Sequence, residues 1–275
     1  MAVITTDQIE RWLQEDVGHH DVTNDVLGET TGRLVATEVG VAAGLSAAVR
    51  VFDYLGVDAT ATVAAGDRID AGETVLEVDG AARAVLRGER VAVNVVGHAS
   101  GVATATRAAV DRAREVDDAV RVAGTRKTTP GLRGVEKRAI AAGGGDTHRL
   151  DLSHMVMVKE NHVAELGLAA AVERFRERAS FATKIEVEIE DPGDAARAAD
   201  AGADVVLFDN LPPAAVERGV AELPPETLAE ASGGITLGEV ADYAATGVDV
   251  ISMGSLTHSA AALDYSFRTG DGARG

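Results

Sequence analysis

The chain of 275 residues has no cysteine, only four lysines and few aromatic side chains. The lack of cysteine excludes disulfide bonds, thiolate metal sites and cysteine nucleophiles. No stretch approaches 18 consecutive apolar residues, and the first residues lack the basic and then apolar pattern of an export signal. We therefore expect a cytoplasmic protein that spans no membrane. Apolar residues make up 46% of the chain, which is enough for a buried core and excludes general disorder.

The charge balance is strongly acidic, with 44 acidic against 26 basic residues and a formal net charge of -18. A surface of this sign disfavours nucleic acid and anionic membranes as partners. Plentiful acidic residues with scarce lysine are also typical of proteins from salt-loving organisms; an ordinary acidic surface is the alternative. Three of the four lysines, Lys127, Lys137 and Lys159, lie in one segment, and the fourth is Lys184.

The first hundred residues predict a mixed α and β domain. Thr6 is the expected cap of a short helix that carries Ile9, Trp12 and Leu13 on one face. Alternating apolar and polar residues predict strands at 33–39, 59–64 and 74–78. Helical periodicity covers 45–55 and then 81–115, with Gly88, Gly97 and Gly101 as interruptions. No linker rich in proline or serine divides the chain, so we place the boundary inside the long helical stretch. The expected domains are 1–104, with the tail 262–275 as a candidate addition, and 105–261.

Short apolar runs alternate with helical patterns in the remaining chain. The expected strands are 119–123, 155–158, 184–189, 204–208, 228–231 and 249–253, and the expected helices are 132–142, 165–179, 193–201, 212–222 and 236–245. This alternation predicts right-handed βαβ units and a parallel sheet. A closed or nearly closed α/β barrel fits best. An open doubly wound sheet is the alternative, and it is weakened because no GxGxxG motif follows an early strand.

Polar residues and glycines follow the carboxyl end of each expected barrel strand, which is where barrel enzymes carry their sites. They include Arg126, Lys127, Lys159, Asp209, Ser232, Gly233, Gly234, Gly254 and Ser255. Glu186 and Glu188 have the same parity on one strand and therefore face the same side. The sequence Ser-Gly-Gly at 232–234 suits a phosphate held by backbone N–H groups, although a tight turn alone would also explain it.

One segment of this acidic chain is basic. Residues 121–149 contain seven arginines and lysines against two acidic residues, and His148 adds a further donor. An isolated pair such as Arg126-Lys127 usually marks a solvated loop, but here it follows a buried strand and precedes Pro130. The segment therefore favours a ligand with several anionic groups, phosphates together with carboxylates.

Several motifs resemble the quinolinate phosphoribosyltransferase family over nearly the whole chain. They are GTRKTTPGLRGVEKRAIAAGGGDTHRLDL at 124–152, VKENH at 158–162, IEVEIED at 185–191, VLFDN at 206–210, ASGGI at 231–235 and GVDVISMGSLTHS at 247–259. In the first hundred residues, RWLQEDVGHHDVT at 11–23 and GERVAVNVVGHASGVATATR at 88–107 fit as well. The resemblance implies an N-terminal α/β sandwich and an incomplete α/β barrel, in a homodimer with shared active sites that could assemble further.

The resemblance also implies a reaction. Quinolinate and phosphoribosyl pyrophosphate would give nicotinate mononucleotide, pyrophosphate and CO2, with Mg2+ as cofactor. Matched by position, Arg126, His148 and Arg149 would hold the quinolinate carboxylates, with Arg90 of the partner subunit. Lys127 and Lys159 would lie near the pyrophosphate and the reacting carboxylate, and Glu188 and Asp209 near the ribose and the metal. Ser232, Gly233, Gly234, Gly254 and Ser255 would bind the 5′-phosphate.

The match to the family pattern is imperfect around the expected carboxylate pocket. The departures are Gly124, Thr147, Asp151, His154 and Glu160, and none of them removes an expected ligand. The molybdenum-transport-associated relatives share TRKTTPG and HRL but tend to lack the block that here reads Lys-Glu-Asn-His. A non-catalytic barrel that binds a phosphorylated metabolite is a rival from another class. It would not need cations and carboxylates at six strand ends.

Overall fold

The computed structural model describes residues 4–270, and the chain divides into two units. The first unit comprises the N-terminal residues to Arg107, the segment Pro130–Gly144 and the C-terminal residues from Ala260. Its elements are α1 (Thr6–Val17), β1 (Glu29–Ala36), β2 (Gly40–Val41), α2 (Leu45–Tyr54), β3 (Asp58–Ala61), β4 (Arg68–Ile69), β5 (Thr74–Ala81), most of α3 (Ala82–Arg114), α4 (Arg133–Ala142) and β12 (Tyr265–Thr269).

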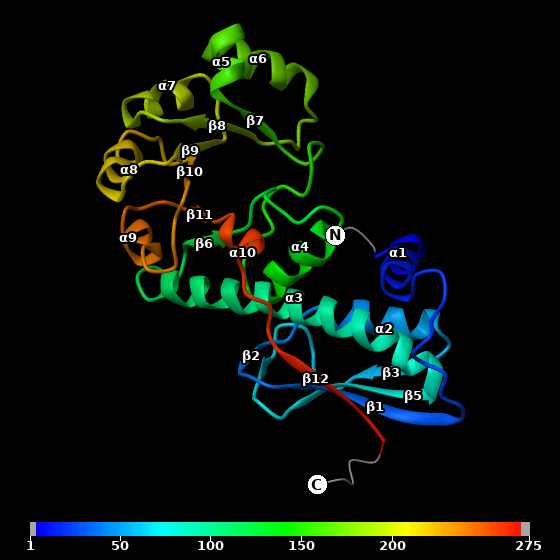
Figure 1. Ribbon diagram of the computed structural model, residues 1–275. Helices are drawn as coiled ribbons and strands as arrows, with labels where there is room; N and C mark the ends of the chain where they lie inside the picture. Colours follow the sequence, from blue (N-terminus) through cyan, green and yellow to red (C-terminus); the bar gives the residue numbers. More distant parts are fainter. Residues whose placement is uncertain (1–3, 271–275) are drawn as a thin grey trace. The chain divides into compact units, whose positions relative to one another are not determined.

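A four-stranded antiparallel sheet of order β12-β1-β5-β3 forms one layer of the first unit (Figure 1). Helix α2 contributes to two apolar cores. Ala48 and Phe52 pack with the sheet residues, while Ala47 and Val51 pack with α1, α3 and α4. The C-terminal tail therefore supplies an edge strand to this unit, and α4 supplies apolar side chains to its helical core.

Two local expectations for this region were wrong in detail. Thr5, and not Thr6, caps α1, because the Thr5 side chain accepts a hydrogen bond from the backbone N–H of Gln8. The three glycines expected to interrupt the long helix lie inside a continuous α3. At Gly101 a Cβ atom would come within 2.0 Å of the carbonyl oxygen of Ala261, so the glycine allows a close approach of the tail and does not break the helix.

The second unit, Ala108–Thr129 and Gly145–Ser259, contains the alternating strands and helices. Its elements are the end of α3, β6 (Arg121–Ala123), β7 (Val156–Val158), α5 (Glu160–Leu166), α6 (Leu168–Arg178), β8 (Ile185–Ile189), the 3-10 helix η1 (Pro192–Asp194), α7 (Ala195–Asp200), β9 (Val205–Asp209), α8 (Pro213–Val220), β10 (Leu228–Ser232), α9 (Val240–Ala244), β11 (Val250–Ser252) and α10 (Ser255–His258). The helix expected at 165–179 corresponds to α6 and begins three residues later, because Gly167 at a φ of 75° separates it from α5, which was not predicted.

All six strands of this unit are parallel and follow the order β6-β11-β10-β9-β8-β7 (Figure 1). Among the described residues, the two end strands β6 and β7 do not pair with each other, and a single bridge joins Ala123 to Asp146. The expected incomplete parallel α/β barrel is confirmed. Within residues 4–270, no helix is long and apolar enough to cross a membrane.

Candidate active site

The parallel order brings the carboxyl ends of six strands to one edge of the second unit. Nearly all of the expected site residues lie in this unit, on the ends of the strands or in the segments that follow them. Arg90 is the exception, since it lies exposed on α3 in the first unit. The basic residues Arg133, Lys137 and Arg138 of the 121–149 segment belong to α4 and also lie in the first unit.

One group of charged side chains joins β7, β8 and β9. Lys159, directly after β7, has its Nζ 2.5 Å from Oε2 of Glu188 on β8. Burial raises the pKa of Asp209 at the end of β9, and the negative charge of Glu188 raises it further, while Lys159 and Lys127 act in the opposite sense. The two carboxylates therefore repel each other in a site that also holds two lysines, an arrangement suited to a ligand that carries both phosphates and a cation.

Asn210 connects this group to the glycine loop after β10. Its Nδ2 donates a 2.8 Å hydrogen bond to Oδ2 of Asp209, and its backbone N–H donates to the carbonyl of Ser232. Asn210 has a φ of 54°, which is unusual for a residue other than glycine. A Cβ atom on Gly233 would lie 2.3 Å from the Asn210 side-chain oxygen. Asn210 therefore fixes both a carboxylate and the start of the loop Ser232–Gly233–Gly234.

The remaining loop follows β11 and lies close to Lys127. A Cβ atom on Gly254 would lie 2.9 Å from Cδ of Lys127, and the Thr257 hydroxyl donates a 2.5 Å hydrogen bond to the backbone carbonyl of Lys127. The structure thus brings Lys127, after β6, together with Gly254 and Thr257, after β11. The neighbouring order of β6 and β11 in the sheet accounts for this contact.

His148 lies between two buried carboxylates from the interior of the sheet. Its Nε2 is 3.0 Å from Oε2 of Glu230 on β10 and 3.8 Å from Oε1 of Glu186 on β8. Burial disfavours a charged imidazole, but the contacts with Glu186 and Glu230 outweigh it and raise the pKa of His148 to about 10. Burial raises the pKa of Glu186, and the neighbouring charge of Glu230 adds to the rise, against the effects of His148 and Arg149. This group is therefore a buried cluster in which two neighbouring carboxylates favour the charged form of the histidine.

Two arginines beside this cluster have no carboxylate as a hydrogen-bond partner within the described part of the chain. Nη2 of Arg149 donates to the thioether of Met157, which is a weak acceptor, at 2.8 Å. Nε of Arg126 is buried and has no hydrogen-bond partner among the described residues. Burial lowers the pKa of Arg149, and the positive charge of Arg126 lowers it further while Glu186 and other carboxylates raise it. In the described part of the chain, neither guanidinium hydrogen-bonds a carboxylate, which leaves both able to bind one from a ligand.

Sequence reasoning missed the roles of Glu230 and Asn210 and noted only the orientation of Glu186. The signal for Glu230 was available, because a glutamate at the centre of the apolar run 228–231 is costly unless it has a cationic partner. The role of Asn210 rests on a left-handed backbone conformation and on contacts with the next strand. A single sequence does not reveal these.

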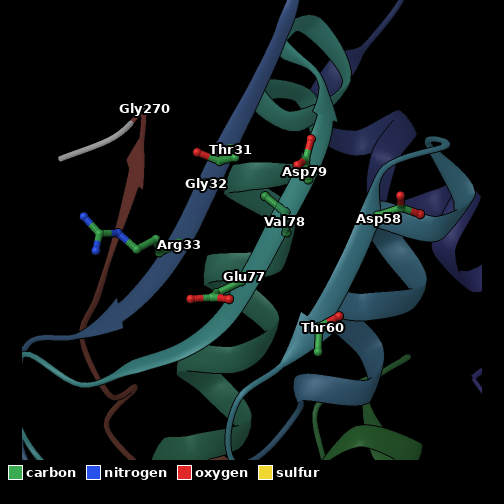
Figure 2. A pocket seen from close by; sticks show the side chains of 9 residues that line it. All are labelled: Thr31, Gly32, Arg33, Asp58, Thr60, Glu77, Val78, Asp79 and Gly270. Carbon is green, nitrogen blue, oxygen red and sulfur yellow. The ribbon is translucent and has the colours of Figure 1, made fainter.

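A cavity of about 450 Å³ lies elsewhere in the chain, on the four-stranded sheet of the first unit (Figure 2). Asp58, Glu77 and Asp79 line it together with a single cation, Arg33. The excess of carboxylates disfavours anionic ligands there. No residue predicted from the sequence to belong to the site lines this cavity.

Comparison with known proteins agrees with this picture. The family model described as quinolinate phosphoribosyl transferase, N-terminal domain, matches residues 21–100, and the model for the C-terminal domain matches residues 102–268. A probable nicotinate-nucleotide pyrophosphorylase (carboxylating) from Methanothermobacter thermautotrophicus is 42% identical over 94% of this chain and 97% of the relative. The nicotinate-nucleotide pyrophosphorylase (carboxylating) of Homo sapiens is 41% identical over 94% of this chain and 90% of its own length.

Solved structures of similar proteins have the same fold as this chain. The crystal structure of NadC from Streptococcus pyogenes superposes with a TM-score of 0.90 at 36% sequence identity, covering 98% of this chain and 99% of that one. A crystal structure of a NadC deletion mutant superposes with a TM-score of 0.92 at 37% identity, covering 98% of each chain. The similarity therefore extends over both units and not over the barrel alone.

Proposed function

The chain belongs to the quinolinate phosphoribosyltransferase family, and on this premise we propose how its own residues carry out the reaction. The enzyme joins the ring nitrogen of quinolinate to the anomeric carbon of phosphoribosyl pyrophosphate. Pyrophosphate leaves, a carboxylate is lost as CO2, and nicotinate mononucleotide is formed for NAD biosynthesis. The observation that carries the assignment of residues is the pair of arginines, Arg126 and Arg149, that hydrogen-bond no carboxylate within the described residues.

Quinolinate binds through its two carboxylates to the cations of the β6 and β7 region. Arg126 and Arg149 supply planar guanidinium groups, and His148 supplies a cationic imidazole. Carboxylate recognition by such groups gives short, charge-assisted hydrogen bonds of defined geometry. Bound quinolinate would replace the weak thioether acceptor of Arg149 with a carboxylate oxygen.

Phosphoribosyl pyrophosphate occupies the edge formed by β8, β9, β10 and β11. Lys127 and Lys159 neutralise the pyrophosphate, while backbone and side-chain donors of Ser232, Gly233, Gly234, Gly254 and Ser255 receive the 5′-phosphate. Support comes from the contact between Lys127 and Gly254 and from the two consecutive glycines at positive φ, whose backbone N–H groups are not shielded by a Cβ atom.

Glu188 and Asp209 suit a bound Mg2+. Oxygen ligands from carboxylates are the donors that this cation prefers, and a divalent cation would relieve the repulsion that raises the pKa of Asp209. When bound, Mg2+ supplies positive charge to the leaving pyrophosphate. Lys159 would share that task, since its Nζ already lies against Glu188.

The reaction needs charge complementarity rather than a nucleophilic side chain. As the bond from the anomeric carbon to pyrophosphate breaks, positive charge grows on the ribose, and Glu188 and Asp209 would supply the carboxylates that stabilise it. Lys127 and Lys159 stabilise the leaving group. Once the ring nitrogen carries the ribose, its positive charge stabilises the electron pair that stays on the adjacent ring carbon when CO2 leaves. A proton from water then replaces CO2 on that carbon. The protein therefore acts mainly by positioning and neutralising two polyanions.

A homodimer would complete the quinolinate site with Arg90 of the partner subunit. The support is the family resemblance, together with the exposed position of Arg90 on α3. Mixed dimers of inactive Arg90→Ala and inactive Lys159→Ala chains test this directly. We expect partial recovery of activity, because one site in each mixed dimer keeps all its groups. Confirmed mixed dimers without activity would contradict shared sites.

The variant Arg149→Ala tests the assignment of the quinolinate site. Loss of a bidentate, charge-assisted contact should lower kcat/KM for quinolinate by about a hundredfold or more. Arg178→Ala is the matched control, since Arg178 is an exposed arginine in the last turn of α6. An Arg149→Ala enzyme that handles quinolinate as well as the control would refute the assignment.

A further inference from the structure

His148, Glu186 and Glu230 form the most completely buried group of charged side chains in the second unit. Glu186 is fully buried and Glu230 is 2% exposed. Both oxygens of Glu186 and Oε1 of Glu230 have no hydrogen-bond partner in the described part of the chain. Buried carboxylates without donors destabilise a fold unless a positive charge lies close to them. The positive charge nearest to both is the imidazole of His148.

The backbone directs the His148 ring toward these carboxylates. His148 has a φ of 52°, and its backbone N–H donates a 2.7 Å hydrogen bond to Oδ1 of Asp146. A left-handed conformation at a residue other than glycine is held in place by its surroundings and is frequent at functional sites. Oε2 of Glu230 then accepts the hydrogen of Nε2 at 3.0 Å. Among the residues described, Nδ1 of His148 has no hydrogen-bond partner.

We propose that Glu186 and Glu230 are positioning residues that keep His148 doubly protonated, with its Nε2–H toward the protein and its Nδ1–H toward a carboxylate of quinolinate. A neutral imidazole would not serve equally well. With its single hydrogen on Nε2, it would turn a lone pair toward the substrate carboxylate and repel it. The inference rests on the proposed quinolinate site, but it adds the reason why a histidine acts there as a permanent cation.

The surrounding charges support this role. The groups that face His148 are Glu186 from β8 and Glu230 from β10, and the adjacent Arg149 acts on both carboxylates. With both glutamates ionised, two carboxylates, one imidazolium and one guanidinium sum to zero, so a protonated His148 balances the charge of this buried cluster. Contacts with both glutamates also raise the pKa of His148 well above neutral pH.

The wild-type protein provides the first test, which is independent of catalysis. Histidine labelled with 15N reports the protonation of both ring nitrogens by NMR, and the His148 signal is identified by its absence in His148→Gln. We expect both nitrogens of His148 to carry hydrogen at pH 8, where an ordinary histidine is neutral. A neutral His148 at pH 8 overturns the proposal even if the enzyme is fully active. The proposed function fails separately, if quinolinate is not converted.

Kinetics of isosteric variants provide the second test. Glu230→Gln and the double variant Glu186→Gln/Glu230→Gln keep the side-chain volumes but remove negative charge. We expect His148 to lose its charge at pH 8 in the double variant, and KM for quinolinate to rise roughly tenfold to a hundredfold. KM for phosphoribosyl pyrophosphate should stay within about twofold of the wild-type value. A merely structural role of the glutamates would not separate the two KM values in this way. Glu226→Gln, an exposed glutamate before β10, is the matched control.

Three further results would contradict the proposal. One is an unchanged KM for quinolinate in the double variant, and another is a similar rise in both KM values. The third concerns a metal, since the ligand atoms of the three residues lie within 4.8 Å of one another. A stoichiometric metal ion in the purified wild-type protein, lost in Glu230→Gln, would show that the carboxylates hold a cation other than the imidazolium.

Discussion

Nζ of Lys159 lies 2.5 Å from Oε2 of Glu188, so a cation from the end of β7 meets a carboxylate from β8. The lysine side chain is 47% exposed, while that of the glutamate is 15% exposed. Lys159 therefore has room to extend toward a ligand, whereas Glu188 is held inside the sheet edge. This pair is the point at which the proposed leaving-group cation and the proposed metal ligand are in direct contact.

The first prediction concerns this lysine. Lys159→Ala should lower kcat/KM by about a hundredfold or more, because it removes a charge that stabilises the leaving pyrophosphate. Lys184→Ala is the matched control, since Lys184 is exposed and precedes β8 at the end of the sheet opposite Glu188. Steady-state kinetics with quinolinate compares the two variants. Equal activity of the two would remove Lys159 from the site.

Two neighbouring glycines give a prediction for the phosphate loop. Gly233 and Gly234 both have a positive φ, so alanine costs roughly 1–2 kcal/mol of backbone strain at either position. Only at Gly233 would the new Cβ meet Asn210, with the backbone nitrogen at 2.6 Å. Gly233→Ala should therefore raise KM for phosphoribosyl pyrophosphate about tenfold or more, and Gly234→Ala should raise it much less. The reverse order would contradict the assigned loop geometry.

Tyr265 predicts a loss of stability at alkaline pH. Its hydroxyl donates a 2.9 Å hydrogen bond to Ser100, and burial raises its pKa from 10.0 to about 12. Because the pKa is higher in the folded state, the stabilisation is complete below pH 10 and disappears as the pH rises toward 12. Urea unfolding should show about 1–3 kcal/mol of loss across this range in the wild type. The variant Tyr265→Phe should not show this loss. The same dependence of the free energy of unfolding on pH in both proteins would contradict the prediction.

The net charge of -18 predicts a response to salt. At molar ionic strength the Debye length falls to about 3 Å, so repulsion among surface carboxylates is screened. We expect the Tm to rise by several degrees between 0.1 M and 2 M KCl. Matched scans in sucrose at low salt control for general solute effects. A Tm that does not change with KCl would contradict adaptation to high salt.

The sequence predicted the six strands and most of the helices of the second unit because each has a clear local signal, whereas the helices α5 and α10 were not predicted. The run at 204–208 and the strand Val205–Asp209 differ by one residue, and the helix at 212–222 corresponds to Pro213–Val220. The strands β2, β4 and β12 were not predicted. Two-residue strands have no measurable period, and β12 is defined by its pairing with β1, more than two hundred residues earlier in the chain.

Helix α4 shows a different limit of sequence reasoning. Its period predicted a helix at 132–142, and the structure has one at Arg133–Ala142. Val135, Ala139 and Ile140 enter the helical core of the first unit, although the helix follows the first strand of the second unit. An apolar stripe indicates that a helix face is buried and does not specify the core that buries it.

The candidate site was predictable to the extent that its residues follow strands. Lys159 and Asp209 lie where alternating strands and helices place polar residues, and the family resemblance gave each an expected role. The buried partner of His148 was not predicted, because Glu230 approaches it across 82 positions in the chain. Contacts of this kind depend on the order of strands in the sheet, which local periodicity does not encode.

The most direct test of the central claim is a balance of carbon and phosphate with the purified protein. It is given phosphoribosyl pyrophosphate, Mg2+ and quinolinate labelled with 14C in both carboxylates, and parallel reactions contain nicotinate instead. We predict one labelled CO2 and one pyrophosphate for each nicotinate mononucleotide formed from quinolinate, and no product from nicotinate. Product from nicotinate at a comparable rate, or no release of CO2 from quinolinate, would contradict the account.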